Sequence, residues 1–146
     1  MPLSRVQPQD YCALLEKKVE TVCELMAPFS APEPQIHASP PIGFRLRAEF
    51  RMWHDDDSIN YVMFRREDPR TPVVVTDFVI ADARIQYLMP LLREKLIANH
   101  TLRHKLFQVE FLVSLSGDVL LTLIYHRKLD QTWESAARQL ASELHD

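Results

Sequence analysis

The chain has 146 residues, of which 47% are hydrophobic, and its formal net charge is -3 at pH 7. This length and apolar content match one globular domain with a hydrophobic core, and they leave no room for a second domain. The small negative charge excludes a general electrostatic attraction to nucleic acid. Any such role must therefore come from local clusters of Lys and Arg.

The cysteines and the N-terminus bear on cellular location. Cys12 and Cys23 are the only cysteines, and on one helix they would lie about 16 Å apart, too far for a disulfide bond. The N-terminus has no apolar segment flanked by basic residues, and no stretch approaches the roughly 20 apolar residues that span a bilayer. We therefore expect a reducing, cytoplasmic location and no membrane partner.

The first third of the chain predicts a helix and a connector. Between Pro8 and Met26, apolar residues recur at three- and four-residue steps, which predicts an amphipathic helix with Pro8 in its first turn. The prolines between residues 28 and 41 exclude regular structure and predict an extended connector. The apolar stripe of the helix consists of Tyr11, Leu15, Val19, Val22 and Met26.

Residues 44–53 alternate strictly in polarity, which predicts a strand with one core face and one polar face. The acidic run 55–57 is typical of a hairpin turn, and residues 59–66 and 71–75 are predicted as further strands. An antiparallel sheet is therefore expected. The core face of the first strand comprises Phe44, Leu46, Ala48, Phe50 and Met52, and the polar face comprises Arg45, Arg47, Glu49, Arg51 and Trp53.

A second helix and a hairpin follow. Residues 81–100 carry a helical stripe, and the short basic segment 103–105 comes after it. Residues 106–115 and 119–126 are predicted as two strands around Gly117, whose freedom to adopt positive φ suits a tight turn. The stripe consists of Ile85, Leu88, Met89, Leu92 and Leu96.

Asp130 is expected to cap a last helix that runs toward Leu144. Runs of strands thus lie between helices instead of alternating singly with them. This order predicts an α+β fold, with an antiparallel sheet packed against about three helices. We find no internal repeat.

The first basic cluster is on the strand at residues 44–53. A period of two places Arg45, Arg47 and Arg51 on one face, with Trp53 beyond them, and such a face could follow a phosphate backbone. The alternative is a solvated sheet face on which Glu49 pairs with its Arg neighbours. The strand alone leaves both interpretations open.

The second basic cluster is the segment 102–108, which contains Arg103, His104, Lys105 and Phe107. Basic groups bind phosphates, and an aromatic ring can stack on an unstacked base for about 1 to 3 kcal/mol. The alternative is that Phe107 belongs to the core, because it alternates with apolar residues at positions 109, 111 and 113. Spacing does not decide between them.

Motifs for catalysis or cofactor binding are not visible. His100 and His104 are four residues apart but have no third ligand at a recognised spacing, so we expect no metal site. Gly43 and Gly117 are too far apart to build a phosphate or methyl-donor loop. No Ser, Cys or Thr lies in an activated-nucleophile pattern, and His54 beside three aspartates fits a polar turn. We expect no catalytic residue and no cofactor in this chain.

Four blocks carry a family resemblance. In chain order they are residues 26–30 (MAPFS), 44–54 (FRLRAEFRMWH), 102–108 (LRHKLFQ) and 123–130 (LIYHRKLD). Together they resemble the N-terminal part of tRNA (uracil-5-)-methyltransferases, and the match spans nearly the whole chain.

The resemblance implies a partner and two contact residues. In that family an α/β RNA-binding region precedes a Rossmann-like domain that holds S-adenosylmethionine, and the enzymes form 5-methyluridine in the T-loop of tRNA and in the matching arm of tmRNA. An Arg and a Phe of the region contact the RNA, and by motif they fall on Arg51 and Phe107. Phe107 would support the loop after the target base leaves its stack.

The resemblance also implies what this chain lacks. The family's Cys nucleophile, carboxylate base and glycine-containing methyl-donor motif belong to the later domain, and neither Cys12 nor Cys23 occupies the catalytic motif. We expect a truncated piece that is inactive alone and lacks the C-terminal methyltransferase domain. The sequence departs from the family at Asp56, where a glycine is expected, and this predicts a wider hairpin.

Three functions compete at this point. The leading hypothesis is an RNA-recognition module of a methyltransferase. A second is catalysis by an unrecognised site, which the missing glycines and nucleophile motifs disfavour. A third is a protein-interaction module without RNA binding of its own, in which the face carrying Trp53 and Phe107 docks a methyltransferase or other partner domain.

Overall fold

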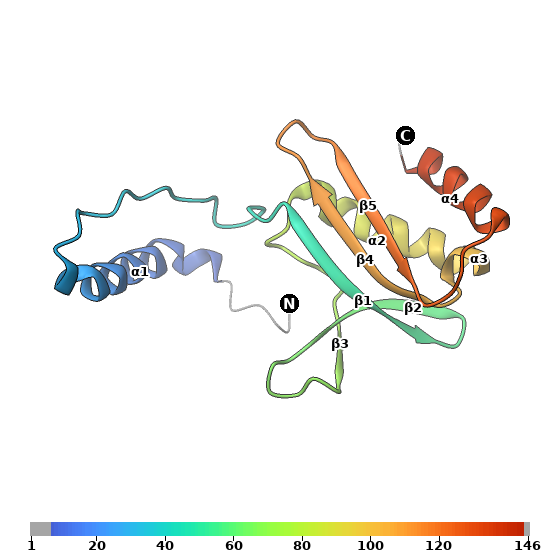
Figure 1. Cartoon of the computed structure of the whole chain (residues 1–146), viewed down its shortest axis with the longest axis horizontal. Coiled ribbons are helices and arrows are strands. Elements are labelled where there is room, and N and C mark those ends of the chain that lie inside the picture. Colours follow the sequence, from blue (N-terminus) through green and yellow to red (C-terminus); the bar gives the residue numbers. More distant parts are fainter. Residues whose placement is uncertain (1–6, 145–146) are drawn as a thin grey trace.

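The computed structural model describes residues 7–144, which form one five-stranded sheet and four α-helices (Figure 1). Every strand pairing is antiparallel, and the strand order is β3-β2-β1-β4-β5. The predicted α+β fold is confirmed, and the single-turn α3 is added to the three predicted helices. The elements are η1 (Pro8–Asp10), α1 (Tyr11–Met26), η2 (Ala27–Phe29), β1 (Arg47–Asp55), β2 (Ser58–Phe64), β3 (Pro72–Val74), α2 (Ala83–Ala98), α3 (His100–Arg103), β4 (Leu106–Val113), β5 (Val119–Tyr125) and α4 (Gln131–Glu143).

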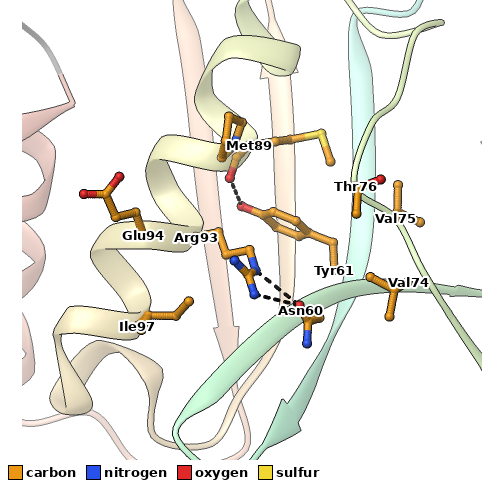
Figure 2. A pocket seen from close by; sticks show the side chains of 10 residues that line it. Asn60, Tyr61, Val74, Val75, Thr76, Met89, Arg93, Glu94 and Ile97 are labelled. Carbon is orange, nitrogen blue, oxygen red and sulfur yellow. Dashed lines mark hydrogen bonds between the residues drawn. The ribbon is translucent and has the colours of Figure 1, made fainter.

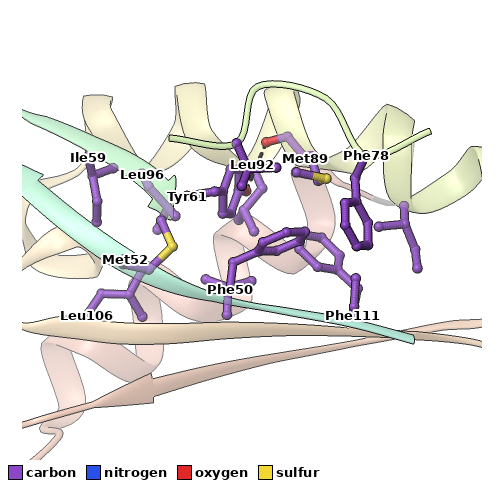
Figure 3. Close-up of a cluster of buried hydrophobic side chains, with 14 of the residues drawn as sticks. Phe50, Met52, Ile59, Tyr61, Phe78, Met89, Leu92, Leu96, Leu106 and Phe111 are labelled. Carbon is purple, nitrogen blue, oxygen red and sulfur yellow. Dashed lines mark hydrogen bonds between the residues drawn. The ribbon is translucent and has the colours of Figure 1, made fainter. Parts of the chain in front are cut away.

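The hydrophobic core lies between one face of the sheet and the helices α2, α3 and α4 (Figure 3). The alternation predicted for β1 places Ala48, Phe50 and Met52 in this core. The Phe50 ring centroid is 5.2 Å from that of Phe78 and 5.4 Å from that of Tyr61. Burying a side chain of this kind stabilises the fold by about 1.5–3 kcal/mol. From α2 the core receives Ile85, Met89, Leu92 and Leu96.

Two aspartates are the N-cap residues of helices α2 and α4, which cover this face of the sheet. The Asp82 carboxylate accepts a hydrogen bond from the backbone N–H of Arg84 at the start of α2. The Asp130 carboxylate accepts one from the backbone N–H of Trp133 at 2.8 Å, as the sequence predicted. Each cap satisfies a backbone donor that has no partner within its own helix.

The first strand begins later than predicted. Residues 44–46 precede β1, and Phe44 is 40% exposed instead of belonging to the core. The reason is a short parallel bridge between Arg45 and Ala81, in which Arg45 N–H donates to the Ile80 carbonyl and Asp82 N–H donates to the Arg45 carbonyl. The Leu46 carbonyl accepts a hydrogen bond from the Val113 N–H, and regular pairing with β4 begins at Arg47.

The hairpin between β1 and β2 is narrower than predicted. Asp55 pairs with Ser58, so only Asp56 and Asp57 form the turn. Asp56 has a φ of 48°, in the left-handed region that favours glycine. Asp tolerates this conformation better than most residues because its short side chain can bond locally. The expectation of a wider hairpin was therefore wrong: the departure at Asp56 leaves the turn short.

Helix α1 stands away from the sheet at the far end of an extended connector (Figure 1). The helix ends at Met26 as predicted, but the single 3-10 turn η2 includes Pro28, where no regular structure was predicted, and the extended connector begins only after it. None of the 16 residues of α1 is buried. Within the part of the chain that the structure describes, no helix combines the length and apolarity needed to cross a bilayer.

Candidate nucleic-acid interface

The face of the sheet opposite the core is polar and exposed along β1. Arg47, Glu49, Arg51 and Trp53 all point to this side, as the alternation predicted. Arg45 is also exposed, but it precedes the strand, and its Nε donates to the Arg47 carbonyl. We call this side, with the corresponding positions of β4 and β5, the outer face.

Three side chains from neighbouring strands form a stack on the outer face. The guanidinium carbon of Arg51 lies 3.8 Å from the centroid of the Phe107 ring. The His126 ring lies 3.8 Å from the same ring, at an interplanar angle of 25°. Arg51 comes from β1, Phe107 from β4 and His126 from the residue that follows β5. We refer to these three residues as the stack.

A β-bulge places Phe107 in the stack. Leu106 pairs with Tyr125 and Gln108 pairs with Ile124, so Phe107 is an extra residue on β4. A bulge re-aims a side chain that regular alternation would send to the other face. Phe107 is therefore half-buried and is not part of the core, whereas Leu106 and Val109 beside it are buried. The alternative that Phe107 is a core residue does not hold.

The backbone before the bulge is in an unfavourable conformation. Lys105 has a φ of 56°, in the left-handed region, and its carbonyl accepts a hydrogen bond from the His126 N–H at 3.1 Å. A non-glycine residue held there costs of order 1–3 kcal/mol and persists only where its surroundings impose it. The bond between Lys105 and His126 joins the two chain segments that carry the aromatic members of the stack.

Ionisable groups surround the end of the sheet near the stack. The rings of His100 and His104 are stacked with centroids 5.3 Å apart. Partial desolvation, followed by the charges of His100, Lys105 and Arg127, lowers the pKa of His104. Arg127 Nε donates to the His104 carbonyl at 3.1 Å, which ties these segments together. His54 Nε2 donates to the Leu106 carbonyl at 2.8 Å.

Arg103 does not share this exposure. It is buried, with Nη1 donating to the carbonyls of Asp57 at 2.7 Å and Ile97 at 2.6 Å. Nη2 forms a salt bridge with the Asp57 carboxylate at 3.2 Å. The guanidinium thus holds the β1–β2 turn against the end of α2. We leave Arg103 out of the proposed RNA contacts for this reason.

At the other end of β1, Arg47 is paired with carboxylates on a solvated sheet face, which was the alternative to phosphate binding. Its Nη2 lies 3.1 Å from the Glu49 carboxylate and 3.6 Å from that of Glu110 on β4. Exposed pairs of this kind contribute about 0–1 kcal/mol each. Their carboxylates also reduce the positive potential that a phosphate would meet at this position.

A groove of about 510 Å³ lies on the helix-covered side, between α2 and the strands β2 and β3 (Figure 2). The polar groups that line it form hydrogen bonds with other groups of the same chain. The Tyr61 hydroxyl donates to the Met89 carbonyl at 2.9 Å, and burial raises the pKa of that hydroxyl. Arg93 Nε donates to the Ile59 carbonyl, and Nη2 donates to the Asn60 side chain. We find no reactive arrangement among these side chains.

The remaining candidates for chemistry are dispersed. Cys12 and Cys23 are exposed on α1, which lies away from the sheet. Among residues 7–144, no group of three or more His, Cys, Asp or Glu side chains is arranged to hold a metal ion. The arrangement can bind planar and anionic groups on the outer face.

Sequence reasoning placed Arg51 and Phe107 in a common interface but missed His126 and Arg127. Alternation along β5 could have indicated His126, because Leu121, Leu123 and Tyr125 pack against the core and the next position then points outward. Its contact with Phe107 depends on the bulge, which no residue pattern indicated. Trp53 lies on the same face but outside the stack.

Comparison with known proteins gives consistent matches over the chain. The family model described as tRNA (Uracil-5-)-methyltransferase matches residues 10–146. The tRNA/tmRNA (uracil-C(5))-methyltransferase of Aromatoleum aromaticum is 49% identical over 144 residues, which are 99% of this chain and 39% of that protein. The protein of the same name from Pseudomonas syringae is 53% identical over 137 residues, which are 94% of this chain and 38% of that protein.

This chain thus spans about two fifths of the length of these relatives. The four sequence blocks and the family match cover the same region. The chain belongs to the tRNA (uracil-5-)-methyltransferase family.

Proposed function

We propose that this chain is the tRNA-recognition region of an S-adenosylmethionine-dependent tRNA (uracil-5-)-methyltransferase, and that its outer face binds the T-arm of tRNA and the matching arm of tmRNA. The stack of Arg51, Phe107 and His126 carries the proposal, because it joins a cation and two aromatic rings on an open sheet face. The relatives are named as uracil methyltransferases of tRNA and tmRNA. Stacking on rings and guanidinium planes is a common way for proteins to hold unpaired bases.

The geometry of the stack suggests where a base would lie. Arg51 and His126 each approach within 3.8 Å of the Phe107 ring centroid. Two groups at that distance cannot share one face of a ring, so they cover opposite faces. A base that enters without rearrangement must therefore stack on the outer side of Arg51 or His126. Phe107 would hold both groups in position and support the loop from below.

The phosphates of the same loop would be bound by the neighbouring cations. Lys105 is exposed and immediately precedes the strand that carries Phe107. Arg127 lies next to His126, and His104 can add a positive charge when it is protonated. Phosphate contacts set affinity and orientation, whereas base contacts provide sequence information. Arg47, at the start of β1, and Arg45, which precedes the strand, lie further from the stack and would contribute only if the RNA extends that far.

The methyl transfer itself is assigned to the part of the full-length protein that lies outside this chain. The nucleophile, the base and the S-adenosylmethionine site of the family have no counterpart that we recognise in this sequence. The role proposed for this chain is to hold the T-loop so that the target uracil can leave its stack and reach the catalytic domain.

Titration of the purified chain with a labelled T-arm hairpin, at 50 mM and at 200 mM salt, tests the proposal. A scrambled hairpin of equal length is the control. If three phosphates are neutralised, the affinity should fall by roughly 20- to 40-fold between the two salt concentrations. The T-arm should also bind more tightly than the scrambled hairpin. Equal binding of both hairpins would contradict recognition by this chain.

A further inference from the structure

Helix α1 has an apolar stripe that the described chain covers only in part. Tyr11, Leu15 and Val19 are half-buried, whereas Val22 and Met26 at its C-terminal end are 45% and 44% exposed. The neighbouring Leu25 is 67% exposed, and none of the residues of α1 is buried. An isolated helix of about 12–15 residues is only marginally stable in water, because most helical stability comes from packing of an apolar face. A 16-residue helix with such a stripe therefore indicates a packing partner.

The connector keeps this helix away from the core. Residues 31–42 are almost entirely exposed and contain four prolines. Proline-rich segments are extended and act as semi-rigid spacers. The Tyr11 hydroxyl lies 3.3 Å from the Ser39 hydroxyl, so the connector runs back along the helix instead of folding it onto the sheet (Figure 1). The partner of α1 is therefore not the sheet domain described above.

Charge argues against RNA and against an anionic membrane as the partner. Residues 7–42 contain five carboxylates (Asp10, Glu16, Glu20, Glu24 and Glu33) but only two lysines (Lys17 and Lys18). A segment of this sign is repelled by phosphates, and amphipathic helices that bind membranes are typically rich in Lys and Arg. An apolar protein surface is the partner that fits this helix.

We propose that the apolar stripe of α1 docks on the part of the full-length methyltransferase that lies outside this chain. The relatives are about two and a half times as long as the matched region. A partner within the same polypeptide is favoured by a high effective concentration, set by the linker. The proposal rests on family membership and not on RNA binding by the outer face.

The helix carries its own reporters. Cys12 and Cys23 are exposed and, at about 100° per residue, lie at one flank of the apolar stripe. Docking of the stripe should slow their reaction with a maleimide. The test compares the 146-residue chain with a full-length chimera, in which this chain replaces the matching region of the Aromatoleum aromaticum relative. Peptide mass spectrometry reads labelling at Cys23 alone, without added RNA.

We expect Cys23 to react at least ten-fold more slowly in the chimera than in the isolated chain. Val22→Asp should restore fast labelling in the chimera, whereas Lys17→Asp on the opposite side of α1 should not. Neither substitution should change the melting temperature of the isolated chain, because α1 has no buried residue there. The first variant thus separates loss of docking from loss of folding.

Equal labelling rates in the two proteins would overturn the proposal. So would slow labelling of the isolated chain that depends on its concentration, since the stripe would then be covered by a second copy. Slow labelling of the chimera that appears only in a parallel reaction with T-arm RNA would also overturn it. Failure of the T-arm titration would leave the docking proposal standing, because the proposal expects slow labelling of the chimera without RNA.

Discussion

Arg51 and Arg47 lie on the same face of the same strand, yet their surroundings differ. The Arg51 guanidinium rests on the Phe107 ring, and within residues 7–144 it forms no salt bridge. Arg47 contacts the carboxylates of Glu49 and Glu110. The period of two fixes which face an arginine occupies, but the side chains of the next strand decide whether its charge is available. The stack end of β1 is therefore the end at which we expect RNA.

The largest expected effect comes from Phe107→Ala. Removing the central ring should release Arg51 and His126 from the positions in which a base stacks on one of them, and losing about 1–3 kcal/mol of that stacking corresponds to roughly 5- to 150-fold weaker binding. The salt dependence should hardly change, because no charge is removed. Affinity for the T-arm hairpin at two salt concentrations provides the measurement.

Phe111→Ala is the matched control for folding. Phe111 is fully buried, and truncation of such a residue costs about 3–5 kcal/mol of stability. Thermal unfolding of the Phe107→Ala variant should show a much smaller loss, because Phe107 is outside the core. A loss as large as that of the Phe111 variant would mean that Phe107 acts mainly in packing.

Arg51→Ala and Arg47→Ala compare the two ends of β1 directly. Arg51→Ala should weaken T-arm binding several-fold and reduce the slope of log affinity against log salt by about 1, as expected for one lost phosphate contact. Arg47→Ala should change both quantities little, because two carboxylates already compensate its charge. Equal losses in the two variants would remove the distinction between the two ends.

Lys105 links the strained backbone to the stack. Lys105→Gly should stabilise the chain by up to about 1 kcal/mol, since glycine adopts a positive φ without steric cost. It should also weaken T-arm binding, because an ammonium group is lost. Lys105→Ala is the control: it removes the same charge but keeps the strain. Urea unfolding that ranks the Ala variant as stable as the Gly variant would refute strain at this position.

The smallest expected effect is a pH dependence at His104. Because the folded state lowers the pKa of His104, this group favours the unfolded chain once it is protonated. Its contribution to stability is complete above the unfolded value of about 6.5 and declines as the pH falls through that value. Nearby phosphates favour the protonated form. T-arm affinity should therefore rise modestly between pH 7.5 and 5.5, and less so in His104→Ala. An identical rise in both proteins would assign the effect elsewhere.

The fold was largely predictable because β1, α2 and α4 follow simple patterns of alternation, helical spacing and capping. The start of β1 was not, because the bridge between Arg45 and Ala81 is a contact between distant segments. The candidate site was predicted in part. Family motifs selected Arg51 and Phe107, but alternation alone assigns Phe107 equally well to the core, and only the bulge turns it outward.

Arg103 shows how a long-range contact can change the interpretation of a basic residue. Its place in a basic segment suggested a phosphate contact, whereas in the structure it is buried and bonds to Asp57, which is 46 residues away in the sequence. The prediction of a wider hairpin at Asp56 failed for a local reason, because an Asp can occupy the left-handed position that glycine usually fills. Local charge and local pattern thus identify candidates, whereas long-range contacts decide their use.

The most direct test of the stack as one binding unit is a double-mutant cycle of Phe107→Leu and His126→Ala, with T-arm affinity as the readout. If the two rings act together, either substitution should weaken binding, and the double variant should be no more than about two-fold weaker than the weaker single variant, because the shared interaction is lost only once. Independent effects that multiply would contradict a single binding unit, and single variants that bind as tightly as the parent chain would contradict recognition of RNA by the stack.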